Sequence, residues 1–577
     1  MQDITHDWIR PHLKPVATRT RSLALARFNG AITVHHEAVM AERISMKKDL
    51  ILITCLLCLL AGPGQITDML GAQENPDPVD SNMTAQVDST ETPVTNESAP
   101  WIHSVDDKFG KIVEYLGAFL FWEVPSLKIP LIVLVLLSGS IFFTIYHGFL
   151  NFRGFKHAIN ITRGKYDNPD DEGEISHFQA LTSALSATVG LGNIAGVAVA
   201  VATGGPGAVF WMMVMGFFGM SAKLHECTLA QLYRRIEPDG TVYGGPMYYI
   251  SIGLGSQGNA MAIVGKVLAL IFAVFCILGS FGGGNMFQAN QCFAAIKKQL
   301  PVLEQHSYDL YFGIFLSIMV GVVIIGGIKQ IGRVTEKIIP SMCAIYLLGG
   351  IIVIVTHFDR IPTAISLIIT GAFTPEAAYG GFIGVLVQGI RRAVFSNEAG
   401  AGSAAIAHSA AKTDEPAREG MVAMLGPFID TVVICAMTGI ILVVTGAYES
   451  PDAGEGVAMT RWAFAQTMPW FPWVLAISIM LFAYSTMISW SYYGEKAWCY
   501  LFGRKSWIRF VYRIIYLLCI VLGTVASLDN VITFSDLMIL SMAFPNIIGG
   551  LFLAGTVKNK LNDYWSRYQN NMFQVYR

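Results

Sequence analysis

Two long apolar stretches of this chain are each interrupted by glycines and polar residues, at 189–193 and at 395–402. The first break reads Val-Gly-Leu-Gly-Asn, and the second reads Phe-Ser-Asn-Glu-Ala-Gly-Ala-Gly. A helix that is broken at bilayer depth frees backbone groups that lipid cannot satisfy, so those groups must face protein, water or a ligand. A pair of such breaks in corresponding positions of two halves is typical of transporters.

The composition indicates an all-α polytopic membrane protein. Hydrophobic residues make up 53% of the 577 residues and charged residues only 14%, whereas a soluble protein carries about 25% charged residues. The formal net charge of −2 leaves no basic tract for nucleic acid. We therefore expect a protein that lies in the lipid bilayer and binds no nucleic acid.

The sequence contains no arrangement typical of an enzyme or of a resident metal. No HExxH motif occurs, and no nucleophile and base stand in a recognisable pattern. The nine cysteines form no recurring CxxC pair with zinc spacing, so we expect neither a metal–thiolate site nor a disulfide framework. We also expect no organic cofactor and no obligate protein partner.

The N-terminal part of the chain is expected to lie outside the membrane domain. A short apolar run at 50–61 follows a basic Met-Lys-Lys at 46–48 and resembles a secretory signal peptide. Residues 1–64 are therefore interpreted as an upstream extension with a signal peptide, and Met1 and Met46 are the two candidate start sites. Residues 65–125 are interpreted as an exported, disordered polar tail, because the stretch up to residue 100 is acidic and rich in Pro, Ser, Thr and Asn.

Apolar runs of about 20 residues, the length that crosses a bilayer, predict about eleven transmembrane helices in a transport domain at 126–556. Basic residues concentrate in alternate loops, which the positive-inside rule places in the cytoplasm. We expect a multi-pass protein of a bacterial plasma (inner) membrane, with its N-terminus outside and its tail, 557–577, in the cytoplasm. The expected spans lie near 128–149, 178–203, 207–233, 260–283, 309–328, 338–357, 380–410, 418–446, 470–500, 508–527 and 530–555, with surface helices or loops at 240–256, 361–373 and 455–467.

The spans also predict an internal repeat. Without the first span, ten remain, and they divide into repeat one at about 177–357 and repeat two at about 380–556. Each break falls in the first helix of its repeat. Because each repeat has five helices, an odd number, the two have opposite topology. The prediction is a 5+5 inverted repeat plus one N-terminal helix.

The first break offers groups for both an anion and a cation. A half-helix that begins near Asn193 would direct amide N–H groups and its positive dipole end into the membrane centre, which suits a carboxylate. The carbonyl groups that end the preceding half-helix suit a bare cation. The alternative is tight helix packing through small residues, but the matched second break favours ligand binding.

Two acidic residues lie at membrane depth in the second half. An ionised carboxyl group inside a span costs about 2.5 to 3.5 kcal/mol, so Glu398 and Asp430 should face a cavity or a partner. Glu398 either shapes the site or only holds it together, and Arg391 and Arg392 are either its counter-ions or residues near the outer interface. Asp430 is either a cation ligand, an anchor behind the ligands, or a structural cap.

Other polar residues in apolar stretches have two interpretations each. Ser485 and Thr486 place two hydroxyl groups on one span, and hard oxygen ligands of this type suit Na⁺; such hydroxyls also commonly bond to their own or a neighbouring helix. The polar run at 285–291, after three glycines, either lines an outer vestibule or forms a loop. Lys223 and Glu226 are expected to form a local ion pair.

Two long motifs carry a family resemblance. The segments Ser-Ala-Leu-Ser-Ala-Thr-Val-Gly-Leu-Gly-Asn-Ile-Ala-Gly-Val-Ala at 183–198 and Gly-Ile-Arg-Arg-Ala-Val-Phe-Ser-Asn-Glu-Ala-Gly-Ala-Gly-Ser-Ala at 389–404 resemble those of the alanine-or-glycine:cation symporters, also called sodium:alanine symporters. The similarity covers about residues 125–560. That family resembles the leucine-transporter fold, and Val-Gly-Leu-Gly-Asn is similar to the first broken helix of the neurotransmitter:sodium symporters. The resemblance implies the same 5+5 repeat with one extra helix, and an amino acid and Na⁺ bound at the breaks.

The resemblance also implies the roles of individual residues. The amides of Leu191 and Gly192 would hold the substrate carboxylate, Phe395 would gate the pocket, and Trp490 would close it against large side chains. Glu398 departs from the wider fold, which often has a small hydroxyl residue at that position. The full set expected to contact substrate is Thr188, Leu191, Gly192, Phe395, Ser396, Glu398 and Trp490.

For the cation, the resemblance implies two Na⁺ sites at the same breaks. Thr188, Asn193 and Ser396 would contribute to one site, together with a group near Asp430. The second site would use backbone carbonyls of the first break and the paired hydroxyls. The full set expected to bind Na⁺ is Ser186, Thr188, Val189, Asn193, Ser396, Asp430, Ser485 and Thr486.

The expected function is Na⁺-coupled symport that imports a small neutral amino acid, alanine or glycine, by alternating access. One alternative is H⁺-coupled symport with the same fold, in which Asp430 or Glu398 carries the proton. A less favoured alternative is a channel or a substrate-sensing receptor. Uptake with and without Na⁺ at fixed pH distinguishes the first two, and loss of accumulation when the gradient collapses distinguishes a symporter from a channel.

Overall fold

Helices form almost all of the regular structure in the computed structural model, which describes residues 114, 117–118, 121–125, 129–303, 308–373 and 381–576. These residues belong to one unit, 95–577. The expected signal peptide and most of the expected exported tail lie outside the described residues. Two short antiparallel sheets are present, in which β1 (Glu123–Val124) pairs with β2 (Ile129–Pro130) and β3 (Arg235–Ile236) pairs with β4 (Val242–Tyr243).

The helices follow the order of the predicted spans, with short connecting turns. Those before residue 380 are α3 (Leu131–Tyr146), α4 (Leu150–Arg153), α5 (Phe155–Thr162), α6 (His177–Thr188), η1 (Leu191–Asn193), α7 (Ala195–Gly204), α8 (Gly207–Leu232), α9 (Pro246–Gly255), α10 (Asn259–Phe281), η2 (Gly282–Met286), α11 (Phe287–Lys297), η3 (Pro301–Leu303), α12 (Asp309–Ile324), α13 (Gly327–Thr356), η4 (Phe358–Arg360) and α14 (Ile361–Phe373). Those after residue 380 are α15 (Gly381–Asn397), α16 (Ala404–His408), α17 (Pro416–Ala423), α18 (Leu425–Pro427), η6 (Phe428–Cys435), α19 (Ala436–Thr445), η7 (Pro451–Ala453), α20 (Val457–Ala465), α21 (Phe471–Phe502), α22 (Ser506–Val525), α23 (Leu528–Ser541) and α24 (Ala543–Gln569).

The chain is a multi-pass membrane protein. Within the described residues, seven helices are long and apolar enough to cross a membrane, or eight if the bent pair α6–α7 counts as one span. Two shorter apolar helices, α3 and α12, lie where further spans were predicted. The count of eleven spans and the inverted repeat therefore stay predictions. The three stretches predicted as surface helices or loops contain the helices α9, α14 and α20.

Both predicted breaks occur, and local sequence explains them. Helix α6 starts at a capping box, in which Ser176 and Gln179 satisfy each other's backbone amides. It ends at Thr188, and the chain bends by 57° before α7. Helix α15 ends at Asn397 because Glu398 has a φ of +55° and Gly400 a φ of +81°, left-handed conformations that stop a helix.

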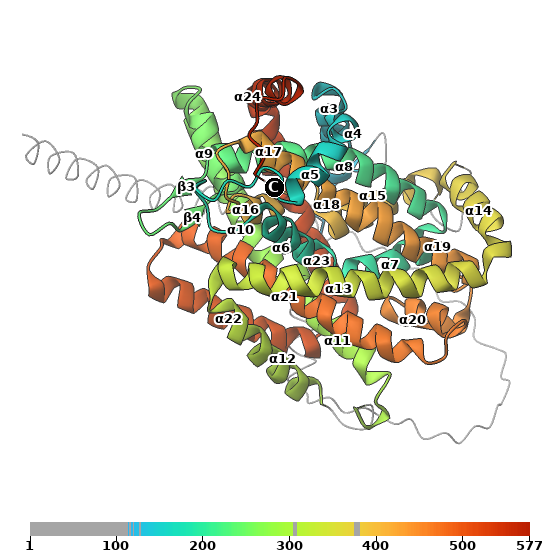
Figure 1. Cartoon of the computed structure of the whole chain (residues 1–577). Helices are drawn as coiled ribbons and strands as arrows, with labels where there is room; N and C mark the ends of the chain where they lie inside the picture. The colour runs from blue at the N-terminus through green and yellow to red at the C-terminus, as the bar shows by residue number, and fades with distance from the viewer. Residues whose placement is uncertain are drawn as a thin grey trace, which may run out of the picture. The chain divides into compact units, whose positions relative to one another are not determined.

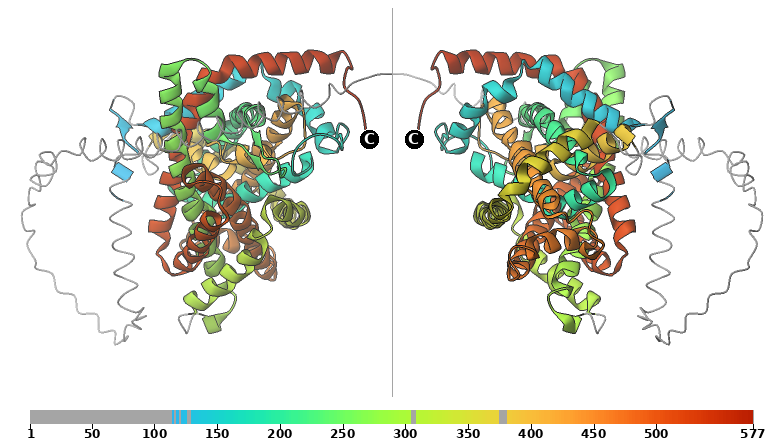
Figure 2. Two further views of the ribbon diagram at one scale, coloured as in Figure 1. Left: turned by 90° about the vertical axis from the view of Figure 1, so that its left-hand side faces the viewer. Right: turned by 90° about the vertical axis from the view of Figure 1, so that its right-hand side faces the viewer.

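The broken helices lie inside the unit, between long neighbours. Figure 1 shows α13 crossing the front of the unit, and both α6 and α21 pack against it. Helix α15 approaches α8 closely, since a Cβ on Gly389 would lie 2.7 Å from the carbonyl oxygen of Ala208. Figure 2 shows α24, in red, running along one edge toward the C-terminus. Helix α24 packs against α3 and α9. The breaks are thereby shielded by helices on several sides.

Candidate functional site at the two helix breaks

The two breaks, which are far apart in sequence, meet in the structure. A Cβ on Gly192, in the first break, would lie 3.4 Å from Cα of Ser396 and 3.5 Å from Cδ1 of Phe395, both in the second break. All thirteen residues predicted to bind substrate or Na⁺ are buried. Among the residues predicted to bind Na⁺, Asn193 and Ser396 contact Asp430, and Ser186 contacts Ser485, which precedes Thr486.

The first cluster is centred on the carboxylate of Asp430, which lies in the π-helical turn η6. Its Oδ1 accepts a hydrogen bond from Asn193 Nδ2 at 2.7 Å, and its Oδ2 accepts one from Ser396 Oγ at 2.8 Å. Thr431 Oγ1 donates to the same Oδ2 at 2.7 Å. One buried carboxylate therefore joins both breaks, and the oxygen atoms of Ser396 and Thr431 stand beside it.

The side chains of Asn193 and Thr188 have specific local partners. The oxygen of Asn193 accepts a hydrogen bond from the Gly190 amide at 2.8 Å while its nitrogen donates to Asp430, so Asn193 braces the first break. The Thr188 hydroxyl donates to the carbonyl of Ala184 at 3.2 Å, within its own helix. Their direct coordination of Na⁺ stays a prediction.

The second cluster lies where α6 meets α21. Ser186 Oγ donates to the backbone carbonyl of Ser485 at 2.6 Å, and Ser485 Oγ donates to the carbonyl of Phe482 at 2.9 Å. The Thr486 hydroxyl is buried and has no hydrogen-bond partner within the described part of the chain. A Cβ on Gly190 would lie 2.5 Å from that hydroxyl, so Thr486 faces the break directly. A buried hydroxyl without a partner needs compensation, and a cation beside Thr486 would provide it.

Gln288 is a site residue that the sequence interpretation did not single out. Its Oε1 accepts a hydrogen bond from the amide of Leu191 at 3.3 Å, the same amide predicted to hold the substrate carboxylate. Its Nε2 donates to the carbonyl of Gly283 at 2.9 Å. Gln288 lies in the polar run at 285–291, which forms a π-turn and a buried helix, so the loop interpretation of that run is wrong.

The three glycines before this run allow α10 and α11 to reach the second break. A Cβ on Gly284 would lie 2.2 Å from Cγ of Trp490, and one on Gly283 would lie 3.4 Å from Cε2 of Phe395. Phe395 also packs edge-to-face on Phe287, with ring centroids 5.3 Å apart. Phe395 and Trp490, the predicted gate and lid, therefore both pack against the glycine-rich turn.

Glu398 holds the second break to its surroundings. Its Oε1 accepts a hydrogen bond from Trp490 Nε1 at 2.9 Å, and its Oε2 accepts one from the Ser403 hydroxyl. Lys223 Nζ donates to the Glu398 backbone carbonyl at 3.0 Å and also pairs with Glu226 at 3.3 Å, as predicted. Glu398 thus links the end of α15, the start of α16 and α21.

The interpretation of Arg391 and Arg392 as counter-ions of Glu398 is wrong. Both arginines pair with Asp536 on α23, Arg391 through Nη2 at 3.0 Å and Arg392 through Nη2. Both precede Phe395 on α15, so they occupy the layer next to the predicted gate. Sequence spacing alone could not identify their partner, because Asp536 lies in a distant helix.

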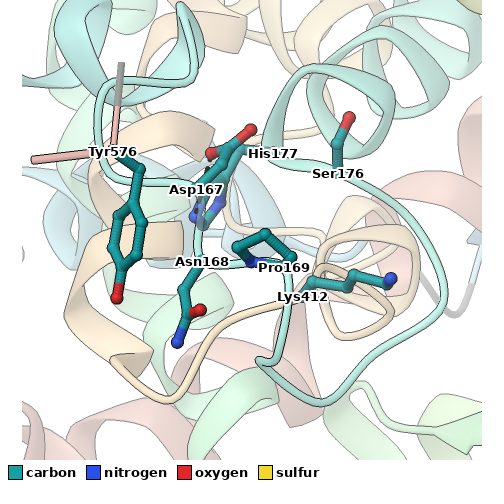
Figure 3. A pocket seen from close by; sticks show the side chains of 7 residues that line it. All are labelled: Asp167, Asn168, Pro169, Ser176, His177, Lys412 and Tyr576. Carbon is teal, nitrogen blue, oxygen red and sulfur yellow. Dashed lines mark ion pairs between the residues drawn. The ribbon is translucent and has the colours of Figure 1, made fainter.

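At the other end of α6, a buried carboxylate connects three helices. Glu419 on α17 accepts hydrogen bonds from His177 on α6 and from His408 on α16, the latter at 2.5 Å. A cavity of about 340 Å³ opens beside His177. Figure 3 shows Asp167 next to the His177 ring, with Lys412 and Tyr576 on opposite sides of the cavity. The cavity contains none of the predicted site residues, and it lies at the N-terminal end of α6 rather than at the break.

Comparison with known proteins identifies the family. Residues 116–576 match the model of the sodium:alanine symporter family. The sodium/alanine symporter AgcS of Methanococcus maripaludis is 42% identical over 431 residues, which cover 74% of this chain and 92% of that protein. The probable sodium/glutamine symporter GlnT of Bacillus subtilis is 35% identical, covering 75% and 87%. A solved structure, MhsT in complex with L-phenylalanine, aligns with a TM-score of 0.45 and 17% identity over 66% of this chain and 89% of that chain. The chain belongs to the sodium:alanine symporter family and is an amino-acid symporter, not an enzyme.

Proposed function

We propose that this protein imports a small neutral amino acid, alanine or glycine, together with Na⁺ by alternating access. The observation that carries the proposal is the convergence of both helix breaks on Asp430, through Asn193 and Ser396. A carboxylate that contacts both breaks would couple the presence of a cation to the relative position of the two broken helices. The names of the related symporters for alanine and for glutamine support an amino acid as substrate but leave its identity to experiment.

In this proposal the Leu191 amide binds the carboxylate of the substrate. In the structure the Leu191 amide donates its hydrogen bond to Gln288 Oε1. The substrate carboxylate would replace Gln288 Oε1 as the acceptor and would also accept a hydrogen bond from Gln288 Nε2. Because Gly192 has no side chain, its backbone is accessible to the substrate; a Cβ there would fill the space up to van der Waals contact with Phe395. In this proposal Phe395 and Trp490, which pack around Gly284, would limit the size of the substrate side chain.

Two cation positions fit the chemistry of the site. Asp430, Ser396 and Thr431 supply hard oxygen atoms at the first, and the Asp430 carboxylate would balance the charge of one Na⁺. The partnerless Thr486 hydroxyl faces the first break at the second, with the carbonyls of Ser186 and Val189 as the predicted further ligands. Asn193 would orient Asp430 even where it is not itself a ligand.

We further propose eleven spans, arranged as a 5+5 inverted repeat after α3, in a plasma membrane. The N-terminus would lie outside and the C-terminus in the cytoplasm, as the basic loops indicate. In that orientation the cluster of Arg391, Arg392 and Asp536 would lie between the breaks and the outer face of the membrane. Glu419 and its two histidines would lie between the breaks and the cytoplasm. Alternating access would open one of these layers while the other stays closed.

The available driving force is adequate for accumulation. One Na⁺ that moves inward through 100 mV contributes about 2.3 kcal/mol, and a tenfold Na⁺ gradient adds about 1.4 kcal/mol. Together these support accumulation of a few hundredfold for each coupled ion. No covalent step is needed.

The test is uptake of labelled alanine into proteoliposomes at fixed pH, with Na⁺ or with choline outside. We expect uptake only with an inward Na⁺ gradient and loss of accumulation when an ionophore collapses it. Undiminished uptake in choline with an inward pH gradient would instead establish H⁺ coupling, for which the buried carboxyl groups of Asp430 and Glu398 are available. Competition by a panel of unlabelled amino acids would then define the substrate.

A further inference from the structure

Next to the predicted gate lies a buried cluster of unequal charge, formed by Arg391 and Arg392 on α15 and Asp536 on α23. Arg392 is 3% exposed and Asp536 is 1% exposed. A single carboxylate oxygen, Asp536 Oδ2, receives the Nη2 atoms of both arginines. Two guanidinium groups against one carboxylate leave one positive charge in excess among the described residues.

Several donors of these guanidinium groups have no partner. Arg391 Nε, Arg392 Nε and Arg392 Nη1 are buried and make no hydrogen bond within the part of the chain that the structure describes. Asp536 Oδ1 is likewise a buried acceptor without a partner there, so three free donors stand against one free acceptor in the cluster. Buried guanidinium nitrogens nearly always find an acceptor, because an unpaired charged donor is costly away from water. The cluster therefore has both the charge and the free donors to bind an anion.

Aromatic rings cover the cluster without supplying an acceptor for these donors. The Phe121 ring lies 4.5 Å from the guanidinium carbon of Arg391, and the Phe395 ring lies 5.3 Å from that of Arg392. Cation–π contacts of this kind stabilise the arginines but leave the in-plane N–H groups free. They also limit the space, so the ligand must be small.

We propose that Arg391, Arg392 and Asp536 form a second binding site, for a small monovalent anion, either a halide or the carboxylate of the amino acid on its way to Leu191. The carboxylate source rests on the proposed function, because it requires an amino acid to pass this layer. The halide source does not depend on it. Arg392 precedes Phe395 by one helical turn, so an anion here would act directly on the predicted gate.

The experiment measures thermal unfolding of the purified, detergent-solubilised protein at constant Na⁺ and constant ionic strength. Chloride, propionate and isethionate are compared as sodium salts, since propionate offers a bare carboxylate and isethionate is too bulky for the cluster. Ligands that bind only the folded protein stabilise it by RT ln(1 + [L]/Kd), so the melting temperature rises with anion concentration once that concentration approaches Kd. The variants are Arg392→Gln, which removes the donors, and Asp536→Asn, which removes the competing carboxylate; Arg461→Gln, on α20, is the control.

We expect chloride or propionate to raise the melting temperature of the wild type and the control relative to isethionate. Arg392→Gln should lose this increase, and Asp536→Asn should reach the same increase as the wild type at about tenfold lower anion concentration because the excess charge is larger. An effect of chloride alone identifies a halide site, and an effect of propionate alone identifies a carboxylate site. Equal melting temperatures in all three salts, for wild type and Asp536→Asn, would overturn the proposal even if Na⁺-dependent alanine uptake is intact.

Discussion

Asn193 Nδ2 and Asp430 Oδ1 lie 2.7 Å apart, although 237 residues separate them in the chain. This hydrogen bond joins the first break to the π-turn in the second half, and Ser396 joins the second break to the same carboxylate. The Asp430 carboxylate thus connects the first break, the second break and the π-turn. The strength of this connection should depend on the charge of Asp430, since hydrogen bonds to an ionised group are worth about 1.5 to 3 kcal/mol.

Asp430→Asn should therefore weaken Na⁺ dependence while the protein still folds, because asparagine keeps the shape of the side chain and can accept from Ser396. We expect the half-saturating Na⁺ concentration for alanine uptake to rise at least about tenfold, a loss of about 1.4 kcal/mol. Thr438→Val is the control, since the Thr438 hydroxyl contacts Tyr346 instead of Asp430. An unchanged Na⁺ dependence in Asp430→Asn would reject Asp430 as a cation ligand.

Gly284→Ala should disrupt the packing around Trp490 in the proposed substrate site. The added Cβ would lie 2.2 Å from Cγ of Trp490, a distance that forces the indole to move, and overpacking of this kind costs about 1 to 3 kcal/mol. We expect loss of alanine uptake and a lower melting temperature. Gly196→Ala, in the broken helix α7, is the matched control, because nothing lies within 4 Å of its added Cβ. Equal effects of the two substitutions would contradict the close packing of Gly284 on Trp490.

The position of the breaks could be predicted from sequence because it depends on local chemistry. Glycines and polar residues inside apolar stretches have few tolerable environments in a bilayer, and in the structure Asn193 and Ser396 both hydrogen-bond to Asp430. That these residues bind Na⁺ stays a prediction. The partners of Arg391 and Arg392 could not be predicted in this way. Their counter-ion, Asp536, is set by the packing of α23 against α15, and a single sequence does not reveal that contact.

Gln288 was missed for the same reason, although a signal was present. Three successive glycines followed by a polar run are unusual within an apolar stretch, and this pattern is compatible with both a vestibule lining and a loop. The third possibility was a π-turn, which keeps the helix continuous while it redirects one residue toward the neighbouring break. π-turns are often found at functional sites, so the same pattern in a related chain indicates a π-turn beside the site.

The side chain of Glu398 should contribute to stability through its hydrogen bonds, and its charge should not contribute to ion coupling. Glu398→Gln retains an acceptor for Trp490 Nε1 and a donor for the Ser403 hydroxyl, so we expect a melting temperature close to that of the wild type and unchanged Na⁺ dependence. Glu398→Ala leaves the buried Trp490 donor unpaired, which costs about 1 to 3 kcal/mol. Thermal unfolding of both variants checks the difference. A pH-dependent uptake that disappears in Glu398→Gln would instead show that this group carries a proton.

His157, on the short helix α5 outside the spans, should make the stability of this region depend on pH. Burial lowers the pKa of His157 to about 4, with further contributions from Arg418 and Lys165. The neutral ring contacts Tyr564 through a hydrogen bond of 2.8 Å and packs on Tyr568 with centroids 3.7 Å apart. The folded protein therefore holds this histidine uncharged at pH values where the unfolded chain protonates it.

The direction of the effect follows from the two pKa values. An unfolded histidine takes up a proton near pH 6.5, so the unfolded state binds more protons than the folded state as the pH falls from about 6.5 to about 4. The free energy of unfolding should therefore decrease across that window and level off below it. His157→Gln should make the decrease of the melting temperature over this range less steep than in the wild type. A slope that is equally steep in His157→Gln would show that another group is responsible.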